Sequence, residues 1–310
     1  MPKNVCHPHR GRLYRALCAG AVVALLAATV ARADVVERTF DVRPGGKLTL
    51  DTDIGSVEVR SAPGNQVQVR VEREVRSGSD KDFELNFEQR GDDVLVEGEK
   101  PGSSWGWSFW NRYKVHFDIV VPENYNLDLE TAGGSIKIAD LIGDVDCHTS
   151  GGSIRIKDID GEVDCRTSGG SVHIGRVEGS VFAKTSGGSI TIDRSGGSVV
   201  AKTSGGSVTV NEVLGSIDAS SSGGSVSARL SSQPLADCRL TTSGGRVEVS
   251  LAGSIGVELD AKTSGGRVHL DMPVTISGEV RRTSVRGAIN GGGPQLYLRT
   301  SGGSIYVKEI

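Results

Sequence analysis

The sequence predicts an all-β fold: a single-domain parallel β-solenoid (β-helix-like) with about 18 residues and two strands per turn, plus an N-terminal β insertion or cap. Three observations lead to this prediction. Glycine supplies 43 of the 310 residues, apolar and polar residues alternate in short stretches, and glycine pairs recur every 18 residues. The regular pairs begin at Gly133, Gly151, Gly169, Gly187, Gly205 and Gly223. A fixed period of about 20 residues is typical of a solenoid, in which each turn packs on its neighbours.

Residues 1–33 have the pattern of a secretory signal peptide. Basic residues are followed by an apolar run at 16–30 and then by Ala31-Arg32-Ala33, a small-x-small cleavage site. The run has 15 residues, fewer than the about 20 that a membrane-spanning helix needs. We expect an exported chain, periplasmic or extracellular, that does not span a membrane after cleavage near Asp34. An uncleaved anchor is the alternative.

Removal of this segment leaves an acidic chain. The segment carries five basic residues and no acidic residue, so its loss changes the formal net charge from −3 to −8. Proteins that bind nucleic acid present clustered Lys and Arg to the phosphates. We therefore expect no nucleic-acid partner.

Residues 34–126 form the predicted N-terminal β region. Residues 45–70 match one degenerate turn of the repeat, and residues 71–126 follow as an insertion or irregular cap. A hairpin is expected where alternating residues from Phe83 to Phe87 and from Val94 to Val96 flank Gly91-Asp92-Asp93. Such a cap would cover the unpaired strand edges at the end of a solenoid, which otherwise invite polymerisation.

Residues 127–310 carry the repeats. Residues three and five positions after each glycine pair are apolar, as in Ile154 and Ile156, and those six and four positions before it are apolar or small, as in Val163 and Cys165. Alternation with period two predicts a half-buried strand on each side of the corner. Glycine is expected at the corners because tight reversals need positive φ. The chain ends inside a strand at 304–310, so we expect an exposed edge there and consider end-to-end self-association.

Three cysteines follow the signal segment: Cys147, Cys165 and Cys238. The first two occupy the slot that later turns fill with Ala183 and Ala201. We interpret them as small buried residues. The alternative is a disulfide between neighbouring turns, which the Cα spacing permits.

All three tryptophans lie in one short segment, at Trp105, Trp107 and Trp110. The first two share the parity of Val115 and Phe117 in the next strand, so we expect them in the core of the cap. Trp110 breaks this parity and is expected to face outward. The alternative is an exposed aromatic cluster that binds sugar rings or a protein partner.

Charged residues repeat on the outward side of one predicted sheet. Arg166, Lys184 and Lys202 place three cations on consecutive turns, beside a second row that contains Asp146 and Asp164. One interpretation is a solvated face whose charges screen one another. The other is a ligand-binding strip for a charged polymer such as an envelope polysaccharide. A threonine two residues before most glycine pairs has the opposite parity and is expected to point inward.

We expect no cofactor, metal site or catalytic residue. The acidic residues at 140–164 lack the spacing of known calcium loops, and no nucleophile elbow, HExxH or CxxC motif occurs. The stacked carboxylates of Asp146 and Asp164 leave one alternative, because polysaccharide hydrolysis uses a carboxyl pair.

The repeated Thr-Ser-Gly-Gly-Ser turns, the signal segment and the strand Ile119-Val120-Val121-Pro122 resemble the bacterial putative-adhesin family of β-strand-repeat domains of unknown function. The resemblance covers residues 34–310 and implies an extracytoplasmic β-solenoid without catalytic residues. We therefore predict a secreted, non-catalytic structural or adhesin-like binding module at the cell envelope, with envelope polysaccharide or another envelope protein as partner. The alternatives are a polysaccharide-active β-helix enzyme and a self-assembling envelope scaffold.

Overall fold

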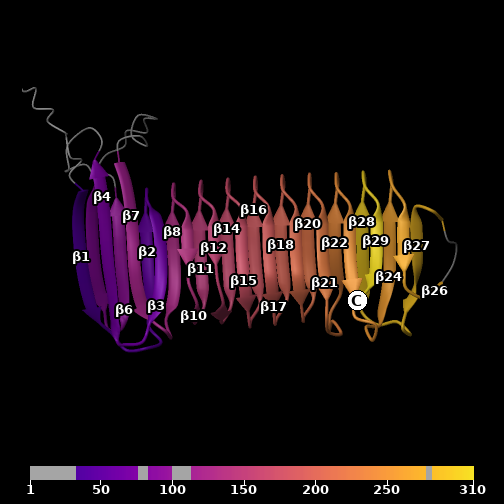
Figure 1. The fold of residues 1–310 in the computed structure, drawn as a ribbon, viewed down its shortest axis with the longest axis horizontal. Helices are drawn as coiled ribbons and strands as arrows, with labels where there is room; N and C mark the ends of the chain where they lie inside the picture. Colours follow the sequence, from indigo (N-terminus) through magenta and orange to yellow (C-terminus); the bar gives the residue numbers. More distant parts are fainter. Residues whose placement is uncertain (1–32, 76–82, 100–112, 277–280) are drawn as a thin grey trace, which may run out of the picture. The chain divides into compact units, whose positions relative to one another are not determined.

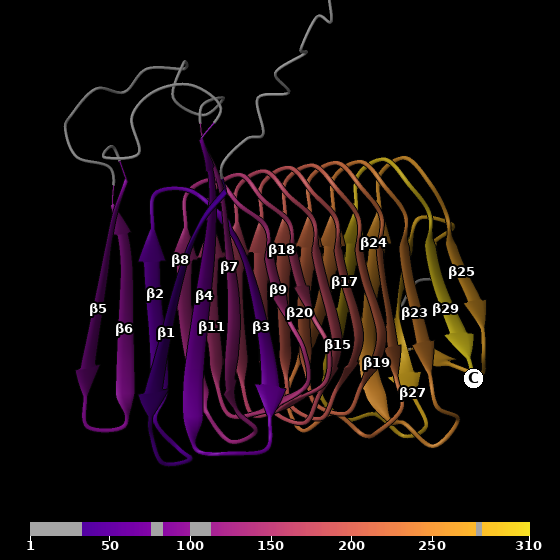
Figure 2. The same ribbon diagram turned by 60° about the vertical axis from the view of Figure 1, so that its left-hand side comes forward.

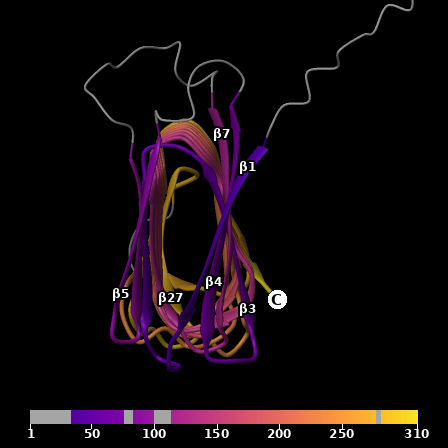
Figure 3. The same cartoon turned by 90° about the vertical axis from the view of Figure 1, so that its left-hand side faces the viewer.

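The computed structural model describes residues 33–75, 83–99, 113–276 and 281–310. These residues contain 29 strands and no helix, and the strands form two sheets (Figure 1). The prediction of an all-β fold is confirmed, and the fold is solenoid-like. The two sheets that these residues form face each other across a narrow interior (Figure 3).

Sheet A contains 15 strands and sheet B contains 14. In spatial order, the main path of sheet A is β1 (Ala33–Asp41), β4 (Gln66–Val75), β7 (Tyr113–Pro122), β3 (Ser56–Ala62), β9 (Ile136–Ile138), β12 (Ile154–Ile156), β15 (Val172–Val177), β17 (Ile190–Ser195), β19 (Val208–Val213), β21 (Val226–Leu230), β23 (Val247–Leu251), β29 (Ile305–Glu309) and β25 (Val268–Asp271). Its two further short strands are β10 (Leu141–Ile142) and β13 (Ile159–Asp160). Sheet B runs β26 (Thr275–Ile276), β27 (Ser284–Ile289), β24 (Val257–Thr263), β28 (Gln295–Thr300), β22 (Cys238–Thr242), β20 (Ile217–Ser221), β18 (Val199–Thr203), β16 (Val181–Thr185), β14 (Val163–Thr167), β11 (Val145–Thr149), β8 (Asn126–Thr131), β2 (Lys47–Thr52), β6 (Asp93–Glu99) and β5 (Glu84–Arg90).

The central strands pair in parallel and in register. In sheet B, Val163 pairs with Val145 on one side and with Val181 on the other, so equivalent residues stand 18 positions apart. In sheet A, Val172 pairs in the same way with Ile154 and Ile190. Identical slots of successive turns therefore stack into ladders along both sheets.

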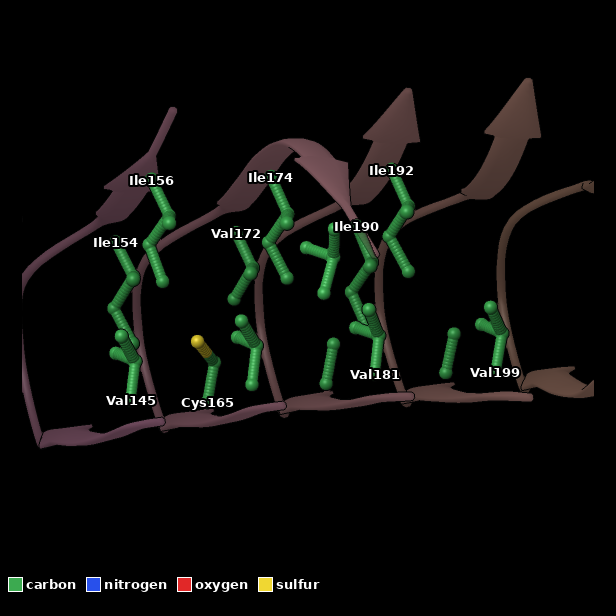
Figure 4. Close-up of a cluster of buried hydrophobic side chains, with 14 of the residues drawn as sticks. Val145, Ile154, Ile156, Cys165, Val172, Ile174, Val181, Ile190, Ile192 and Val199 are labelled. Carbon is green, nitrogen blue, oxygen red and sulfur yellow. The ribbon is translucent and has the colours of Figure 1, made fainter. Parts of the chain in front are cut away.

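The inward ladders form the core. Figure 4 shows Ile154, Val172 and Ile190 of sheet A opposite Val145 and other small residues of sheet B. All of these side chains are at most 2% exposed. Burial of each Val or Ile side chain stabilises the fold by about 1.5–3 kcal/mol, so the repeated slots supply the main driving force. At the middle inward position of sheet B, strands β11 to β20 hold small side chains, whereas the adjoining strands carry Leu129 and Leu240. The small residues are Cys147, Cys165, Ala183, Ala201 and Ala219.

Close stacking, rather than a left-handed backbone, requires the corner glycines. The expectation of positive φ is wrong for most of the regular corners, since among them only Gly143, at φ +142°, lies in that region. A Cβ on Gly152 would overlap the carbonyl of Gly134 in the preceding turn, and one on Gly170 would overlap that of Gly152. A side chain has no room where one corner rests on the next.

A ladder of hydroxyl groups joins the same corners. Thr185 is buried and donates a hydrogen bond to the carbonyl of Gly170 in the preceding turn (2.8 Å), while it accepts one from the amide of Gly188 in its own corner (3.3 Å). The predicted inward direction is confirmed. The same pair of bonds is made by Thr131, Thr149, Thr167, Thr203, Ser221, Thr242, Thr263 and Thr300.

The N-terminal strands belong to the same two sheets. Strands β2 and β3 form one turn, as predicted within 45–70, and the chain then turns back at β4, which runs antiparallel to β1 and β7. Strands β6 and β7 lie on the far side of β2 and β3 and are parallel to them. The predicted hairpin is confirmed as β5 and β6, which pair antiparallel from Glu84 to Glu99.

The last turn of the chain is not at the end of the sheets. Strand β28 lies between β22 and β24 (Figure 1), and strand β29 lies between β23 and β25 (Figure 2). The expectation that residues 304–310 form an exposed edge is therefore wrong. Within the described ranges, the edges at this end are β25 and β26, and those at the other end are β1 and β5.

Candidate functional site: the charged face of sheet B

Three cations stand side by side on the outward face of sheet B. Arg166 on β14 pairs in register with Lys184 on β16, which pairs with Lys202 on β18. Their strands place them there because Cys165, Ala183 and Ala201, one position earlier, point into the core. We call these three residues the basic row. Arg166 and Lys184 are exposed and Lys202 is half-buried, so the predicted row is assembled on the surface.

An acidic row runs beside it, two positions earlier in each strand. Asp146 pairs in register with Asp164, and the next two turns carry Phe182 and Val200 in that slot. Arg166 binds Asp164 of its own strand at 2.6 Å, and its guanidinium lies 5.0 Å from the centre of the Phe182 ring. The members of the row are Asp128, Asp146, Asp164 and Asp218, interrupted by Phe182 and Val200.

The cations differ in how far they are neutralised. Lys202 forms an ion pair with Asp218 of the following turn at 2.9 Å, and Arg166 forms one with Asp164 of its own strand. Lys184 has Phe182, not a carboxylate, two positions earlier in its strand, and no ion pair forms at this lysine within the described part of the chain. Lys184 is therefore the member of the row whose charge is most available to a ligand.

A shallow groove of about 610 Å³ lies along the acidic row. Phe182 and Val200 contribute apolar lining. The acidic lining consists of Asp128, Asp146 and Asp164 of the row together with Asp144 and Glu162 from the neighbouring corners. Lys47 of the N-terminal strand β2 also lines the groove and forms an ion pair with Asp128 at 3.1 Å. The groove thus joins residues from six neighbouring strands of sheet B and the corners that precede them, from Lys47 on β2 to Val200 on β18.

Asp164 is the carboxylate with the most unusual surroundings in the groove. Burial raises its pKa, Arg166 opposes this effect, and the neighbouring carboxylate of Asp146 adds to it. Its Oδ1 is buried and accepts no hydrogen bond from the described residues. Its surroundings therefore favour the protonated form of Asp164 and leave its buried Oδ1 without a hydrogen-bond donor among the described residues.

The sequence identified both rows but not the groove. Phe182 and Val200 were visible as breaks in the aspartate ladder, and an apolar residue in an outward slot was the available signal. The contributions of Lys47 and Asp144 depend on how the turns stack. Trp105, Trp107 and Trp110 lie outside the described residues, so the aromatic-cluster hypothesis stays a prediction; Val115 and Phe117 after them are buried, as their parity indicated.

Among the described residues, no three or more His, Cys, Asp or Glu side chains converge in a way that could hold a metal ion. No helix in this part of the chain has the length and apolar character to cross a membrane.

The fold and its surface define a class: a repeat β protein whose outward ladders display charge. The chain belongs to the Toastrack DUF4097 family, whose profile matches residues 46–308. The predicted membership of a family of β-strand-repeat domains of unknown function is confirmed.

Several solved structures match most of this chain but share little sequence with it. A putative adhesin from Parabacteroides distasonis is 12% identical, with 90% of this chain and 98% of that chain covered and a TM-score of 0.41. A putative adhesin from Bacteroides fragilis is also 12% identical, with 90% and 99% covered and a TM-score of 0.39. A putative lipid binding protein from Parabacteroides distasonis is 12% identical, with 89% and 97% covered and a TM-score of 0.33. Comparison with curated proteins gives no significant match.

Proposed function

We propose that the chain is an exported, non-catalytic binding module of the cell envelope, and that the basic row of sheet B binds an anionic envelope polysaccharide. The observation that carries the proposal is the in-register series Arg166, Lys184 and Lys202, in which Lys184 lacks an ion pair with any described residue. Equivalent residues repeat at about 4.8 Å along such a ladder. A row with this spacing suits an extended polymer that carries repeated charges.

The repeating unit favours the same conclusion. We infer a unit of about 18 residues with two main strands, because the pairs Val145–Val163 and Val163–Val181 both have this offset. Each added turn lengthens the display surface without changing its chemistry. A catalytic site has no need of such repetition, whereas a polymer-binding strip gains contacts with every turn.

The test is binding of the mature chain to immobilised anionic and neutral polysaccharides. Lys184→Glu combined with Lys202→Glu is expected to weaken binding to the anionic polymer by roughly tenfold, since an exposed ion pair is worth about 0.2–1 kcal/mol and reversal adds repulsion. The matched control is Arg155→Glu combined with Lys157→Glu, which makes the same charge change at exposed positions on the sheet A side. Equal loss in both variants, or no loss in either, contradicts the proposal.

A second candidate, a polysaccharide-active enzyme, is favoured by one observation. The carboxyl groups of Asp146 and Asp164 occupy paired positions, and burial raises the pKa of Asp164. A protonated and an ionised carboxyl flank the bond in glycoside hydrolysis. Release of reducing ends by the wild-type chain, and its loss in Asp164→Asn, would replace the binding proposal with this one.

A further inference from the structure

Cys147 and Cys165 form a pair inside the core. They are Cα partners in the parallel register of β11 and β14, and both side chains are fully buried in the narrow inward slot of sheet B. Their Sγ atoms lie 3.0 Å apart. In Figure 4 the sulfur of Cys165 points toward sheet A, in the same direction as the neighbouring Val145 and Val181. The third cysteine of the described chain, Cys238, belongs to β22 and pairs in register with Leu296.

We propose that Cys147 and Cys165 are the site of an oxidative cross-link, an intrachain disulfide that joins two successive turns of sheet B. In-register parallel strands hold their Cα atoms about 4.8 Å apart, within the range of about 4.4–6.8 Å found for disulfides. The Sγ atoms need to approach by about 1 Å to bond. No backbone rearrangement is required, because the register already aligns the two side chains.

The chemistry is thiol–disulfide exchange with a small-molecule or protein disulfide as oxidant. One cysteine thiolate attacks the oxidant, forms a mixed disulfide and releases one thiol; the second thiolate then displaces the other half of the oxidant. The S–S bond of the oxidant breaks and the Cys147–Cys165 bond forms. Two protein thiols are oxidised, one oxidant disulfide is reduced to two thiols, and the two protons lost by the cysteines are taken up by the released thiolates.

Burial decides when the bond forms. Both sulfurs are inaccessible in the folded chain, and burial, followed by the contact with Cys147, raises the pKa of the Cys165 thiol well above its usual value. A neutral, enclosed thiol is a poor nucleophile. Exchange therefore takes place before these two turns close, and afterwards the bond is shielded from reductants.

The first measurement counts thiols. The mature chain is refolded with glutathione disulfide, then unfolded and alkylated without reduction. We expect one alkylated cysteine, Cys238, and a mass two hydrogens below that of the reduced chain; after reduction all three cysteines should react. Three alkylated cysteines before reduction overturn the proposal, as does a disulfide that joins Cys147 or Cys165 to Cys238.

The second measurement separates the bond from the packing. Cys147→Ala combined with Cys165→Ala places in this slot the residue that Ala183 and Ala201 already supply, so the variant should fold. Oxidation should raise the Tm of the wild-type chain by roughly 5–10 °C and leave that of the variant unchanged. An equal response of both proteins to oxidation contradicts an internal bond at this site.

Discussion

The two glycines of each Thr-Ser-Gly-Gly-Ser corner have different surroundings. In the corner at Gly151 and Gly152, a Cβ on the first would lie 3.7 Å from the nearest carbonyl oxygen, whereas a Cβ on the second would overlap the backbone of Gly134. Backbone cannot move aside as the end of a flexible side chain can. The second glycine therefore sets how closely two turns approach.

We expect Gly152→Ala to lower the free energy of unfolding by about 3 kcal/mol or more, because the turns must separate to admit the methyl group. Gly151→Ala, in the same corner, should change it by less than about 1 kcal/mol, since 3.7 Å is an ordinary contact. Denaturant unfolding of both variants measures the difference. Similar values for the two would show that corner stacking is not the constraint.

The hydroxyl ladder gives a second prediction for a single residue. Thr185→Val keeps the shape of the side chain but leaves the carbonyl of Gly170 and the amide of Gly188 without their partner. An unsatisfied buried group costs about 1–3 kcal/mol. Thr191→Val, on an outward and half-buried position of β17, is the control and should change stability by less than about 0.5 kcal/mol. Calorimetric Tm values of the two variants provide the comparison, and equal shifts would argue against the ladder.

At the scale of elements, Asp260 joins the strands at the C-terminal end. It lies on β24, is 13% exposed, and accepts hydrogen bonds from Arg299 of β28 (2.7 Å) and Arg286 of β27 (3.2 Å). Burial acts to raise its pKa, but the two arginines outweigh burial and hold the pKa below its usual value. This carboxylate therefore connects the inserted strand β28 to the antiparallel pair of β24 and β27.

A pH dependence follows from the lowered pKa of Asp260. Its stabilisation is fully present above the unfolded pKa of about 3.9 and is lost as the pH falls through the lower folded value. We expect wild type to exceed Asp260→Asn in unfolding free energy by about 1–3 kcal/mol at pH 7, with the gap closing below about pH 4. Urea unfolding at several pH values measures this difference in unfolding free energy. A difference that persists at low pH would show that the shape of the side chain, rather than its charge, is responsible.

The alternation of apolar and polar residues was sufficient to predict how the central strands stack, but it did not predict the stacking order of the C-terminal strands. Ile305 and Val307 alternate like Val268 and Leu270, so the sequence does not reveal which strand stacks on Val247. The structure places Ile305 there and moves Val268 one position outward. The same limit applies to the surface: the basic row follows from the 18-residue period, whereas the groove needs Lys47, which only the stacking of β2 on β8 brings to Asp128.

For the whole molecule, charge divides unevenly along the chain. Residues 221–310 carry ten basic and seven acidic residues, so they are net positive, whereas residues 34–220 account for the acidic balance. The strand edges at the two ends of the described sheets, β1 with β5 and β25 with β26, therefore lie in segments of opposite net charge. End-to-end self-association, if it uses these edges, should join unlike ends.

We expect the weight-average mass in light scattering to rise with concentration at low salt and to fall toward the monomer as salt screens the ends. Val35→Lys should reduce this rise, because Val35 is 40% exposed on the edge strand β1 and a lysine there opposes pairing. The control Thr191→Lys, on the inner strand β17, should leave it unchanged. A monomer mass at every concentration would eliminate the scaffold hypothesis.

Because the last turn is inserted between earlier ones, the strands at this end are synthesised in a different order from the order in which they stack. Leu240 pairs with Leu298, 58 residues later, whereas Val163 and Val181 are 18 residues apart. The ribosome releases β24 and β25 before the strands that must lie between them and β22 and β23 exist. The middle of the chain can grow turn by turn as it emerges, but this end stays open until residues 295–310 have been made. Without β29, strand β23 would lose its neighbour on one side and β25 would lose its connection to sheet A.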